Sequence, residues 1–440
     1  MAQIGTDCGE GIRSVSVSPT AGRRLWFSVG IGNFIEWFDF AIYGYLATII
    51  AEVFFPPMAP GMGLLSALAV FAVGFVSRPL GAFLLGPIGD RYGRKTVLVI
   101  TVCGMGLVTG LIGLLPGYGQ IGIASPILLI VLRFLQGTMV GGEWSSAGIY
   151  IVESAAQERR ALAASLVTAT AALAFVAGMA VAASLSWALS EQTMISWGWR
   201  IPFLASFLLT GLGLHMRREL AESPVYAVIA NRRRLSPTAA VPTRQKWTSF
   251  AVTFAFSAVF GVSLYYLIAY LANHLIQSVG VTRAAALWTC AAALGLSAVL
   301  HPLIGILSDR WGRRPFMLGA SLGLAVFGYP LFLMLDTANL TVIFAALSVL
   351  AVLVAVAAVM NVVLLVEVFP ASVRSTHAAL GYNLALAVVA GPSPFIAAAL
   401  VHWSGRATAA GWHLSLVALV CFLVLLFTLP ETRRRDIYQG

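Results

Sequence analysis

Four charged residues of this 440-residue sequence, Glu36, Asp39, Arg133 and Glu143, lie inside long apolar stretches. A charge in the middle of a bilayer costs about 2.5–3.5 kcal/mol on insertion scales, so such residues mark functional sites by default. Burial disfavours an ionised carboxylate and a nearby cation favours it, so these carboxylates can take up and release a proton as their surroundings change. We interpret the four residues as a proton-coupling group.

Position and chemistry suggest a role for each member of this group. Glu36 and Asp39 straddle the middle of their apolar stretch, and Asp39 is the slightly better candidate for the proton site, with Glu143 in reserve. Arg133 does not deprotonate, so it can serve as the counter-charge or bind a substrate carboxylate through its planar fork. The alternative is a static salt-bridge network that only holds helices together.

Other polar and aromatic residues at membrane depth predict a substrate cavity. At 100° per residue, Asn33, Phe40 and Tyr43 share a helix face with Asp39, and Gln136 and Trp144 share one with Arg133. The second half of the chain has no comparable charges in its apolar stretches, which predicts a neutral contribution to the cavity. The predicted cavity residues are Asn33, Phe40, Tyr43, Arg78, Gln136, Trp144, Tyr266, Asn361 and Asn383.

A ten-residue pattern occurs twice. The string Gly86-Pro-Ile-Gly-Asp-Arg-Tyr-Gly-Arg-Lys95 recurs as Gly305-Ile-Leu-Ser-Asp-Arg-Trp-Gly-Arg-Arg314. Its Gly-containing turn lets two helices approach, and its Asp can pair with a nearby Arg or face a helix N-terminus. Repeated halves are typical of transporters, whose sites lie near the midplane where the halves meet. The alternative reading is anchoring by basic residues alone.

Twelve apolar runs, each long enough to cross a bilayer, must position these residues. We expect them near 25–50, 63–88, 96–115, 126–152, 162–188, 199–216, 249–275, 284–307, 316–335, 340–366, 376–402 and 411–430. The connectors on one side of the membrane hold 22 Lys and Arg. The other side has three, Arg283, Arg406 and Arg200 at the very start of the run 199–216, and Arg78 and Arg133 lie deeper inside their runs. This asymmetry predicts that both termini are cytoplasmic.

These runs predict an all-α integral membrane protein of twelve transmembrane helices in two six-helix halves. The expected segments are a cytoplasmic tail 1–24, a bundle 25–216, a basic cytoplasmic loop 217–247, a bundle 248–430 and a cytoplasmic tail 431–440. The basic loop is interpreted as an anchor and linker, with lipid head-group binding as the alternative.

Composition argues against most other classes of protein. The chain is 59% hydrophobic and 10% charged, whereas a soluble domain carries about 25% charged residues. The basic residues lie in short connectors rather than in a stripe with exposed aromatics, so no nucleic-acid partner is expected. The four cysteines lack metal-ligand spacing. The sequence contains no catalytic constellation that would indicate an enzyme. It also lacks the G-x-x-x-x-G-K-[ST] loop that would indicate an ATP-driven pump.

The repeated Asp-Arg-aromatic-Gly-Arg-basic pattern resembles the cytoplasmic signature of the major facilitator superfamily. This resemblance implies the major facilitator fold. It also implies that the two loops latch the cytoplasmic side shut when the cavity opens outward. The residues given a gating role in this way are Asp90, Arg91, Gly93, Arg94, Asp309, Arg310, Gly312 and Arg313.

Further strings resemble the metabolite:proton symporter family within that superfamily, over about residues 24–430. Arg133 and the Gly-Gly-Glu-Trp string ending at Trp144 resemble shikimate and organic-acid members, although Ser145-Ser146 stands where shikimate-like members carry Gly-Gly. The strings are Gly32–Gly44, Arg78-Pro-Leu-Gly81, Gln136–Trp144, Gly198–Phe203 and Glu222-Ser-Pro224.

This second resemblance implies a secondary transporter of the inner membrane that imports a small organic acid by proton symport and alternating access. Shikimate, α-ketoglutarate and dicarboxylates are the substrates it suggests. Its expected partners are the substrate, the proton and membrane lipid, and it would work as a monomer with no cofactor beyond the proton motive force. The alternatives are a proton-coupled carrier of a zwitterion such as proline or betaine, an exporter of amphipathic compounds, or a uniporter.

Overall fold

The computed structural model describes residues 19–57, 61–92, 94–141, 148, 151–153, 155–218, 243–369, 374–435 and 437. Within this part of the chain, eight helical stretches are long and apolar enough to cross a membrane, and a bent pair, Asn33–Tyr45 with Ala47–Phe54, makes a ninth. Three shorter apolar helices, Val99–Leu114, Ala124–Val140 and Arg200–Leu214, bring the total to twelve. The predicted all-α, twelve-helix class is confirmed.

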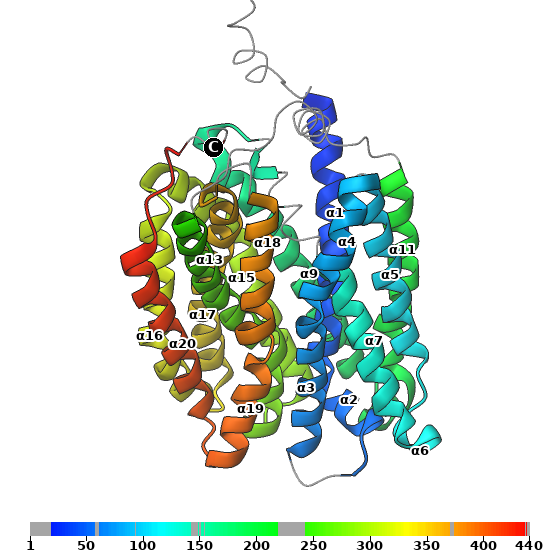
Figure 1. Cartoon of the computed structure of the whole chain (residues 1–440). Helices are drawn as coiled ribbons and strands as arrows, with labels where there is room; N and C mark the ends of the chain where they lie inside the picture. The colour runs from blue at the N-terminus through cyan, green and yellow to red at the C-terminus, as the bar shows by residue number, and fades with distance from the viewer. Residues whose placement is uncertain are drawn as a thin grey trace, which may run out of the picture.

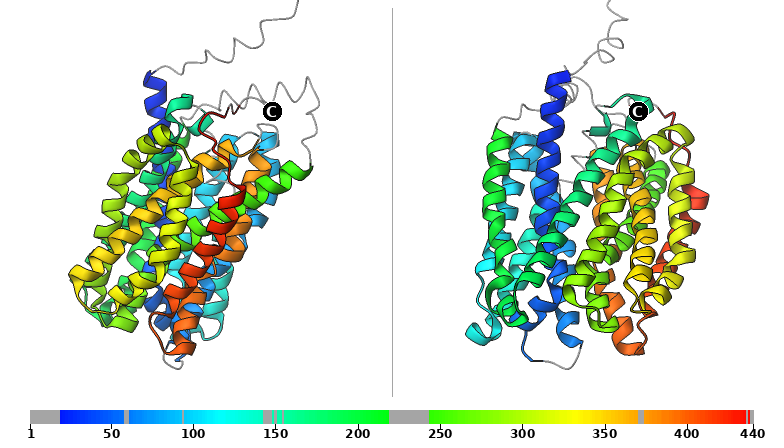
Figure 2. Two further views of the ribbon diagram at one scale, coloured as in Figure 1. Left: turned by 90° about the vertical axis from the view of Figure 1, so that its left-hand side faces the viewer. Right: turned by 180° about the vertical axis from the view of Figure 1, so that it is seen from behind.

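Helices of the first half group on one side of the molecule and those of the second half on the other, with α9 and α15 between them (Figures 1 and 2). The first-half elements are α1 (Pro19–Tyr45), α2 (Ala47–Phe54), α3 (Met62–Val76), α4 (Arg78–Tyr92), α5 (Arg94–Leu114), α6 (Tyr118–Ile121), α7 (Ala124–Val140), η1 (Gln157–Arg159), α9 (Arg160–Ala188), α10 (Glu191–Thr193), η2 (Met194–Gly198) and α11 (Arg200–Arg218). The second-half elements are α13 (Thr243–Tyr265), η3 (Tyr266–Tyr270), α14 (Leu271–His274), η4 (Leu275–Val279), α15 (Arg283–Trp311), α16 (Arg314–Leu335), α17 (Leu340–Glu367), α18 (Arg374–Ala385), η5 (Leu386–Ala390), α19 (Ser393–Ser404) and α20 (Ala409–Thr428). The boundary at 217–247 stays a prediction, because 219–242 lie outside the described residues.

Large apolar side chains cover the outer surface of this bundle. Phe427 is 83% exposed, and Leu208 and Trp187 are each 80% exposed. Side chains of this kind over so much of a surface are unfavourable in water and favourable against lipid. Lipid in turn selects helices, because every backbone polar group must find its partner within the segment. The chain is therefore a multi-pass membrane protein.

The first predicted span, 25–50, is bent rather than straight. Its two helical parts meet at an angle of 64°. The bend follows Gly44, whose carbonyl oxygen accepts a hydrogen bond of 2.9 Å from the Asn273 side chain of the second half. A methyl group at Gly44 would lie 3.0 Å from the Ala269 side chain. Glycine therefore permits close contact between the halves at this bend.

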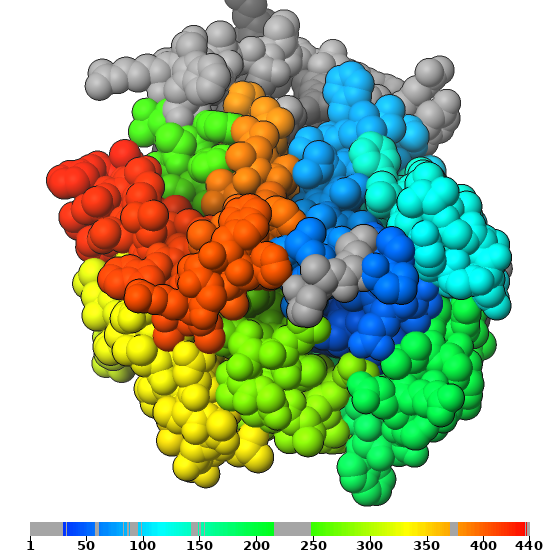
Figure 3. All heavy atoms as spheres, turned by 90° about the horizontal axis from the view of Figure 1, so that it is seen from below, coloured from blue at the N-terminus to red at the C-terminus, as the bar shows by residue number. Residues whose placement is uncertain are grey.

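The two halves touch at both ends of the molecule. At the end where α1 begins and the chain emerges from α20, the start of α9 meets the end of α15 (Figure 1). At the opposite end, α19 lies beside the start of α3 (Figure 3), where a methyl group on Gly61 would be 2.9 Å from the His402 side chain. Arg283 there lies 3.6 Å from Glu191 of the first half. The two halves are therefore in contact at both ends of the molecule.

Candidate functional site

Asp39 lies at the centre of the first half. Its side chain is fully buried, and its Oδ1 accepts a hydrogen bond of 2.6 Å from the Ser206 hydroxyl on α11. Its second oxygen, Oδ2, has no hydrogen-bond partner among the described residues. Asp39 also lines a cavity of about 10 Å³ together with Glu36 and Thr101. A cavity of this size has room for about one water molecule.

Arg133, on α7, lies in a cage of aromatic rings. Its guanidinium carbon is 4.2 Å from the ring centre of Tyr43, 4.9 Å from that of Phe40 and 5.2 Å from that of Phe71. The guanidinium also donates to the Gln136 side chain. Ring faces attract a cation, but they cannot neutralise its charge.

Arg78, the first residue of α4, is a second fully buried cation in the same region. Its guanidinium carbon lies 4.6 Å from the ring centre of Phe75, and that ring packs 4.4 Å from Tyr265 of the second half. In the described part of the chain, no carboxylate lies at ion-pair distance from Arg78 or Arg133.

The predicted cavity residues separate into several environments. Asn33 donates to Val167 and Thr170 on α9, so it faces a neighbouring helix rather than Arg133. Gln136 bonds both Arg133 and Thr109, at the centre of the site. Trp144 and Glu143 lie outside the described residues.

The second-half candidates are similarly divided. The Asn383 side chain donates to the Gly141 carbonyl oxygen of the first half at 2.8 Å, so it lies between the halves. Asn361 donates to Ser257 within the second half. Tyr266 donates to the Ala410 carbonyl oxygen, and its hydroxyl lies 2.7 Å from His413, so it faces the interior of the second half.

Sequence reasoning missed three residues that the structure places at this site. Tyr265 packs across the interface, and Tyr382 is fully buried on α18, which contacts α4, the helix that begins at Arg78. Ser206 bonds Asp39 directly. A tyrosine inside an apolar run is a usable signal for the first two, whereas a serine in a membrane helix is too common to indicate a site.

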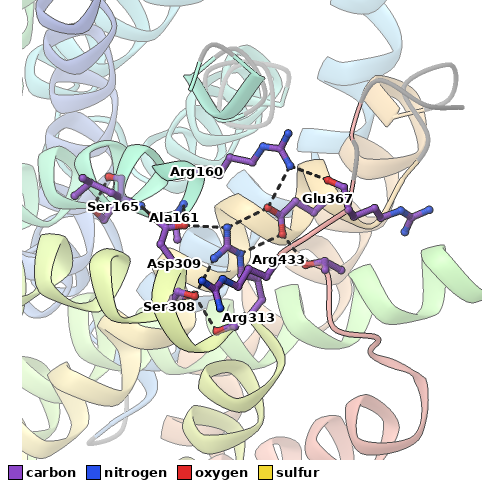
Figure 4. Close-up of polar contacts among 12 residues, drawn as sticks. Arg160, Ala161, Ser165, Ser308, Asp309, Arg313, Glu367 and Arg433 are labelled. Atoms are coloured by element: carbon purple, nitrogen blue, oxygen red, sulfur yellow. Dashed lines mark hydrogen bonds and ion pairs between the residues drawn. The ribbon is translucent and has the colours of Figure 1, made fainter. Parts of the chain in front are cut away.

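The second copy of the repeated motif joins the two halves. The Asp309 carboxylate accepts hydrogen bonds from the backbone N–H groups of Ala161 and Leu162, at 3.0 and 2.9 Å, where α9 begins (Figure 4). A helix N-terminus favours a negative charge. Gly305 allows the approach, since a methyl group there would lie 2.7 Å from the Ala161 carbonyl oxygen. The motif therefore holds α15 of one half against α9 of the other.

Buried ion pairs extend this contact. Arg313 pairs with Asp309 at 2.9 Å and bonds both oxygens of Glu367 at 3.2 Å (Figure 4). Arg160 of the first half donates to the Arg435 carbonyl oxygen at 2.9 Å. Removing one partner from such a network leaves a buried charge uncompensated, which is strongly destabilising.

The segment after α20 caps α16, the helix that follows the second copy of the motif. Glu431 accepts hydrogen bonds from the backbone N–H groups of Arg313 and Arg314 at 2.9 and 3.1 Å, where α16 begins. Burial raises the pKa of Glu431, but its four backbone hydrogen bonds together outweigh burial and hold that pKa below its usual value. The ionised form is therefore favoured in the folded protein, so this cap is present at neutral pH and is lost as the pH falls through the lowered pKa.

The remaining gating candidates are described to different extents. Arg310 is exposed, and Gly312 ends α15 with a φ of +109°, which favours glycine. In the first copy of the motif, Gly93 lies outside the described residues. Asp90, Arg91 and Arg94 are described only as helical backbone.

We expect Asp309→Asn to weaken this contact and reduce uptake, while the protein still reaches the membrane. The amide can accept one of the two backbone hydrogen bonds, and Arg313 loses a charged partner, at a cost of about 1–3 kcal/mol. The readout is labelling of Ser165→Cys, a buried position beside Gly305, by a polar thiol reagent in a background without the native cysteines. Labelling should increase.

Arg310→Gln is the matched control, because Arg310 is exposed on the same turn. It should leave labelling unchanged. Normal transport by both Asp309→Asn and Asp90→Asn would show that the two motif copies have no gating role.

Comparison with known proteins places the chain in a family. Residues 25–254 match the model of the family described as sugar (and other) transporter, and residues 253–439 match that of the major facilitator superfamily. The α-ketoglutarate permease of Escherichia coli is 34% identical, with 92% of this chain and 93% of the permease covered. The shikimate transporter of the same organism is 33% identical over 93% of each chain. Its proline/betaine transporter is 32% identical over 94% of this chain and 85% of the relative.

Solved structures of the same fold agree with the helix arrangement. The xylose transporter XylE from E. coli, in a partially occluded inward-open conformation, superposes with a TM-score of 0.75 at 17% identity, covering 94% of this chain and 99% of that one.

In the described residues, no group of three His, Cys, Asp or Glu could hold a metal ion. The chain belongs to the major facilitator superfamily, within its family of metabolite transporters, and is a secondary transporter of small metabolites rather than an enzyme.

Proposed function

We propose that this transporter imports a small organic acid together with a proton, by alternating access. The supporting relatives include carriers whose names specify α-ketoglutarate and shikimate, both carboxylates. The contacts between the halves at both ends of the molecule are compatible with an intermediate of alternating access.

The observation that carries this proposal is the charge of Arg133. Its side chain is fully buried, yet no described carboxylate lies at ion-pair distance. A buried charge is costly unless it is paired. A substrate carboxylate would supply an anion for this charge and would bind the guanidinium fork through two parallel hydrogen bonds. The second cation, Arg78, makes the same region attractive to an anion.

A second candidate substrate is a zwitterion such as proline or betaine. Relatives named proline/betaine transporters cover most of the chain, and aromatic faces are the usual site for a quaternary ammonium group. In this structure, however, the rings of Phe40, Tyr43, Phe71 and Phe75 already contact a guanidinium. We therefore favour the organic acid.

Uptake by purified protein in proteoliposomes tests the proposal. Radiolabelled shikimate, α-ketoglutarate, proline and glycine betaine are offered with and without an acidic exterior. We expect one of the acids to accumulate only when the pH gradient is present, and a protonophore to abolish that accumulation. Accumulation of the zwitterions alone would favour the second candidate, and accumulation without any gradient would contradict proton symport.

We also propose that both termini and the 217–247 loop face the cytoplasm of the inner membrane. The 22-to-3 distribution of basic residues supports this orientation. Cysteines introduced between 225 and 245 should remain unmodified by an impermeant reagent applied outside the cell. Arg406→Cys, at an exposed position on the predicted external side, should react and serves as the control. Efficient labelling of the loop would overturn the topology.

A further inference from the structure

The contact between Ser206 and Asp39 differs from that of Thr210, the other hydroxyl residue of α11. A serine inside a helix commonly donates to the carbonyl oxygen one turn earlier, and Thr210 does so, bonding the Ser206 carbonyl oxygen at 2.7 Å. The Ser206 hydroxyl instead donates across to Asp39 Oδ1 at 2.6 Å. Both side chains are fully buried. The hydroxyl is thus committed to the carboxylate rather than to its own helix.

Among the described residues, Ser206 is the one hydrogen-bond donor to Asp39. No described Arg, Lys or His lies at ion-pair distance from this carboxylate. Helix α9 has no titratable residue after Arg160, and α11 has none between Arg200 and His215. Inside the predicted spans, the titratable or charged groups on the surrounding elements include Glu36, Tyr43 and Tyr45 on α1, Arg78 on α4, Cys103 on α5, Arg133 on α7 and Tyr265 on α13.

Two opposing effects act on the Asp39 carboxylate. Burial favours the neutral, protonated form, and a hydrogen bond donated to the charged form favours ionisation. Since Oδ2 has no described partner, the Ser206 hydroxyl is the one described group that donates a hydrogen bond to the ionised form. The cavity of about 10 Å³ described above, which has room for about one water molecule, is lined by both Asp39 and Glu36.

We propose that Ser206 is a positioning residue that sets the pH at which Asp39 binds and releases the transported proton. This inference rests on the proposed symport, with Asp39 as the proton site. When Asp39 takes up one proton it becomes the neutral acid, and when it releases that proton the Ser206 hydroxyl stabilises the carboxylate that forms. Ser206 itself neither gains nor loses a proton.

The test is the pH dependence of uptake by Ser206→Ala. Initial uptake rates are measured in proteoliposomes over a range of external pH, at fixed internal pH and fixed membrane potential. Without the hydroxyl, the ionised form of Asp39 loses its donor, so the fall in uptake at high external pH should move upward by about one pH unit. Ser206→Thr keeps the hydroxyl and should retain the original midpoint.

Two further variants make the result specific. Thr210→Ala removes a hydroxyl from the same helix without touching Asp39, so its midpoint should not move. Ser206→Cys nearly conserves volume but has a weak donor, so it should shift the midpoint in the same direction even if Ser206→Ala does not insert stably.

The possible outcomes distinguish a failure of this inference from a failure of the proposed proton symport through Asp39. If Asp39→Asn still accumulates substrate uphill, the proposed proton site fails. If Asp39→Asn is uncoupled but Ser206→Ala and Ser206→Cys keep the original midpoint, symport stands and the role of Ser206 is wrong. A uniform loss of uptake at every pH, without a shift, would likewise assign Ser206 a structural role only.

Discussion

Asp39→Asn should abolish uphill accumulation of substrate and preserve exchange between equal concentrations. The amide cannot take up a proton, yet it keeps the shape of the side chain and can still accept the hydrogen bond from Ser206. For a substrate that moves with one proton and no net charge, each unit of pH difference drives about tenfold accumulation. The accumulation ratio of the variant should therefore fall to about one, as measured by radiolabelled uptake and by counterflow in proteoliposomes.

Glu36→Gln is the companion variant, because Glu36 is the alternative proton site, is also buried and lies one turn earlier on α1. Normal accumulation by Asp39→Asn together with its loss in Glu36→Gln would move the proton site to Glu36. Glu143→Gln tests the reserve candidate. If all three variants accumulate substrate against its gradient, these carboxylates are structural and the symport mechanism is wrong.

Hydropathy predicted the spans well because a long apolar segment in lipid can satisfy its backbone hydrogen bonds only by forming a helix. The run predicted at 340–366 is the helix Leu340–Glu367, and that predicted at 411–430 is Ala409–Thr428. Inside a bilayer, an apolar run of this length must satisfy its own hydrogen bonds and so forms a helix. The bend after Gly44 could not be predicted in this way. It depends on contacts with Ala269 and Asn273, which lie in the other half of the chain.

The repeated motif allowed the partners of its carboxylate to be predicted from local sequence. A carboxylate at a helix end was expected either to pair with an arginine or to face a helix N-terminus, and Asp309 does both. The identity of that N-terminus was not predictable, because α9 lies in the opposite half and the motif's own sequence does not indicate which helix it contacts. Whether the contact gates transport stays a prediction.

Helical periodicity gave the direction of side chains but not their neighbours. Asn33, Asp39 and Tyr43 were placed on one face of α1, yet they meet α9, α11 and α3 respectively. In a crowded bundle, an arc of about 120° on a helix at 100° per residue is wide enough to face several other helices. Adjacent residues show the same limit, since Tyr265 packs across the interface and Tyr266 faces His413 inside its own half.

Arg133→Lys should lose substrate binding, and with it both accumulation and exchange. The ammonium of lysine is a point charge, whereas the guanidinium offers a planar fork that matches a carboxylate. Losing one hydrogen bond to a charged partner costs about 1.5–3 kcal/mol, which weakens binding roughly 10- to 150-fold. Lysine would also give up the hydrogen bond to Gln136 and the flat contact with Tyr43. Binding is measured on the purified variant with the acid identified in the uptake panel.

Arg200→Lys is the control for a generally destabilising Arg-to-Lys change. Arg200 donates to the carbonyl oxygens of Gly113 and Leu115 at 2.7 and 2.8 Å, away from the buried charges, so its variant should bind the acid normally. The two central variants then separate the steps of coupling. Loss of accumulation alone in Asp39→Asn, with loss of exchange as well in Arg133→Lys, would assign the proton to the carboxylate and the substrate to the guanidinium. Unchanged affinity in Arg133→Lys would remove Arg133 from the substrate site.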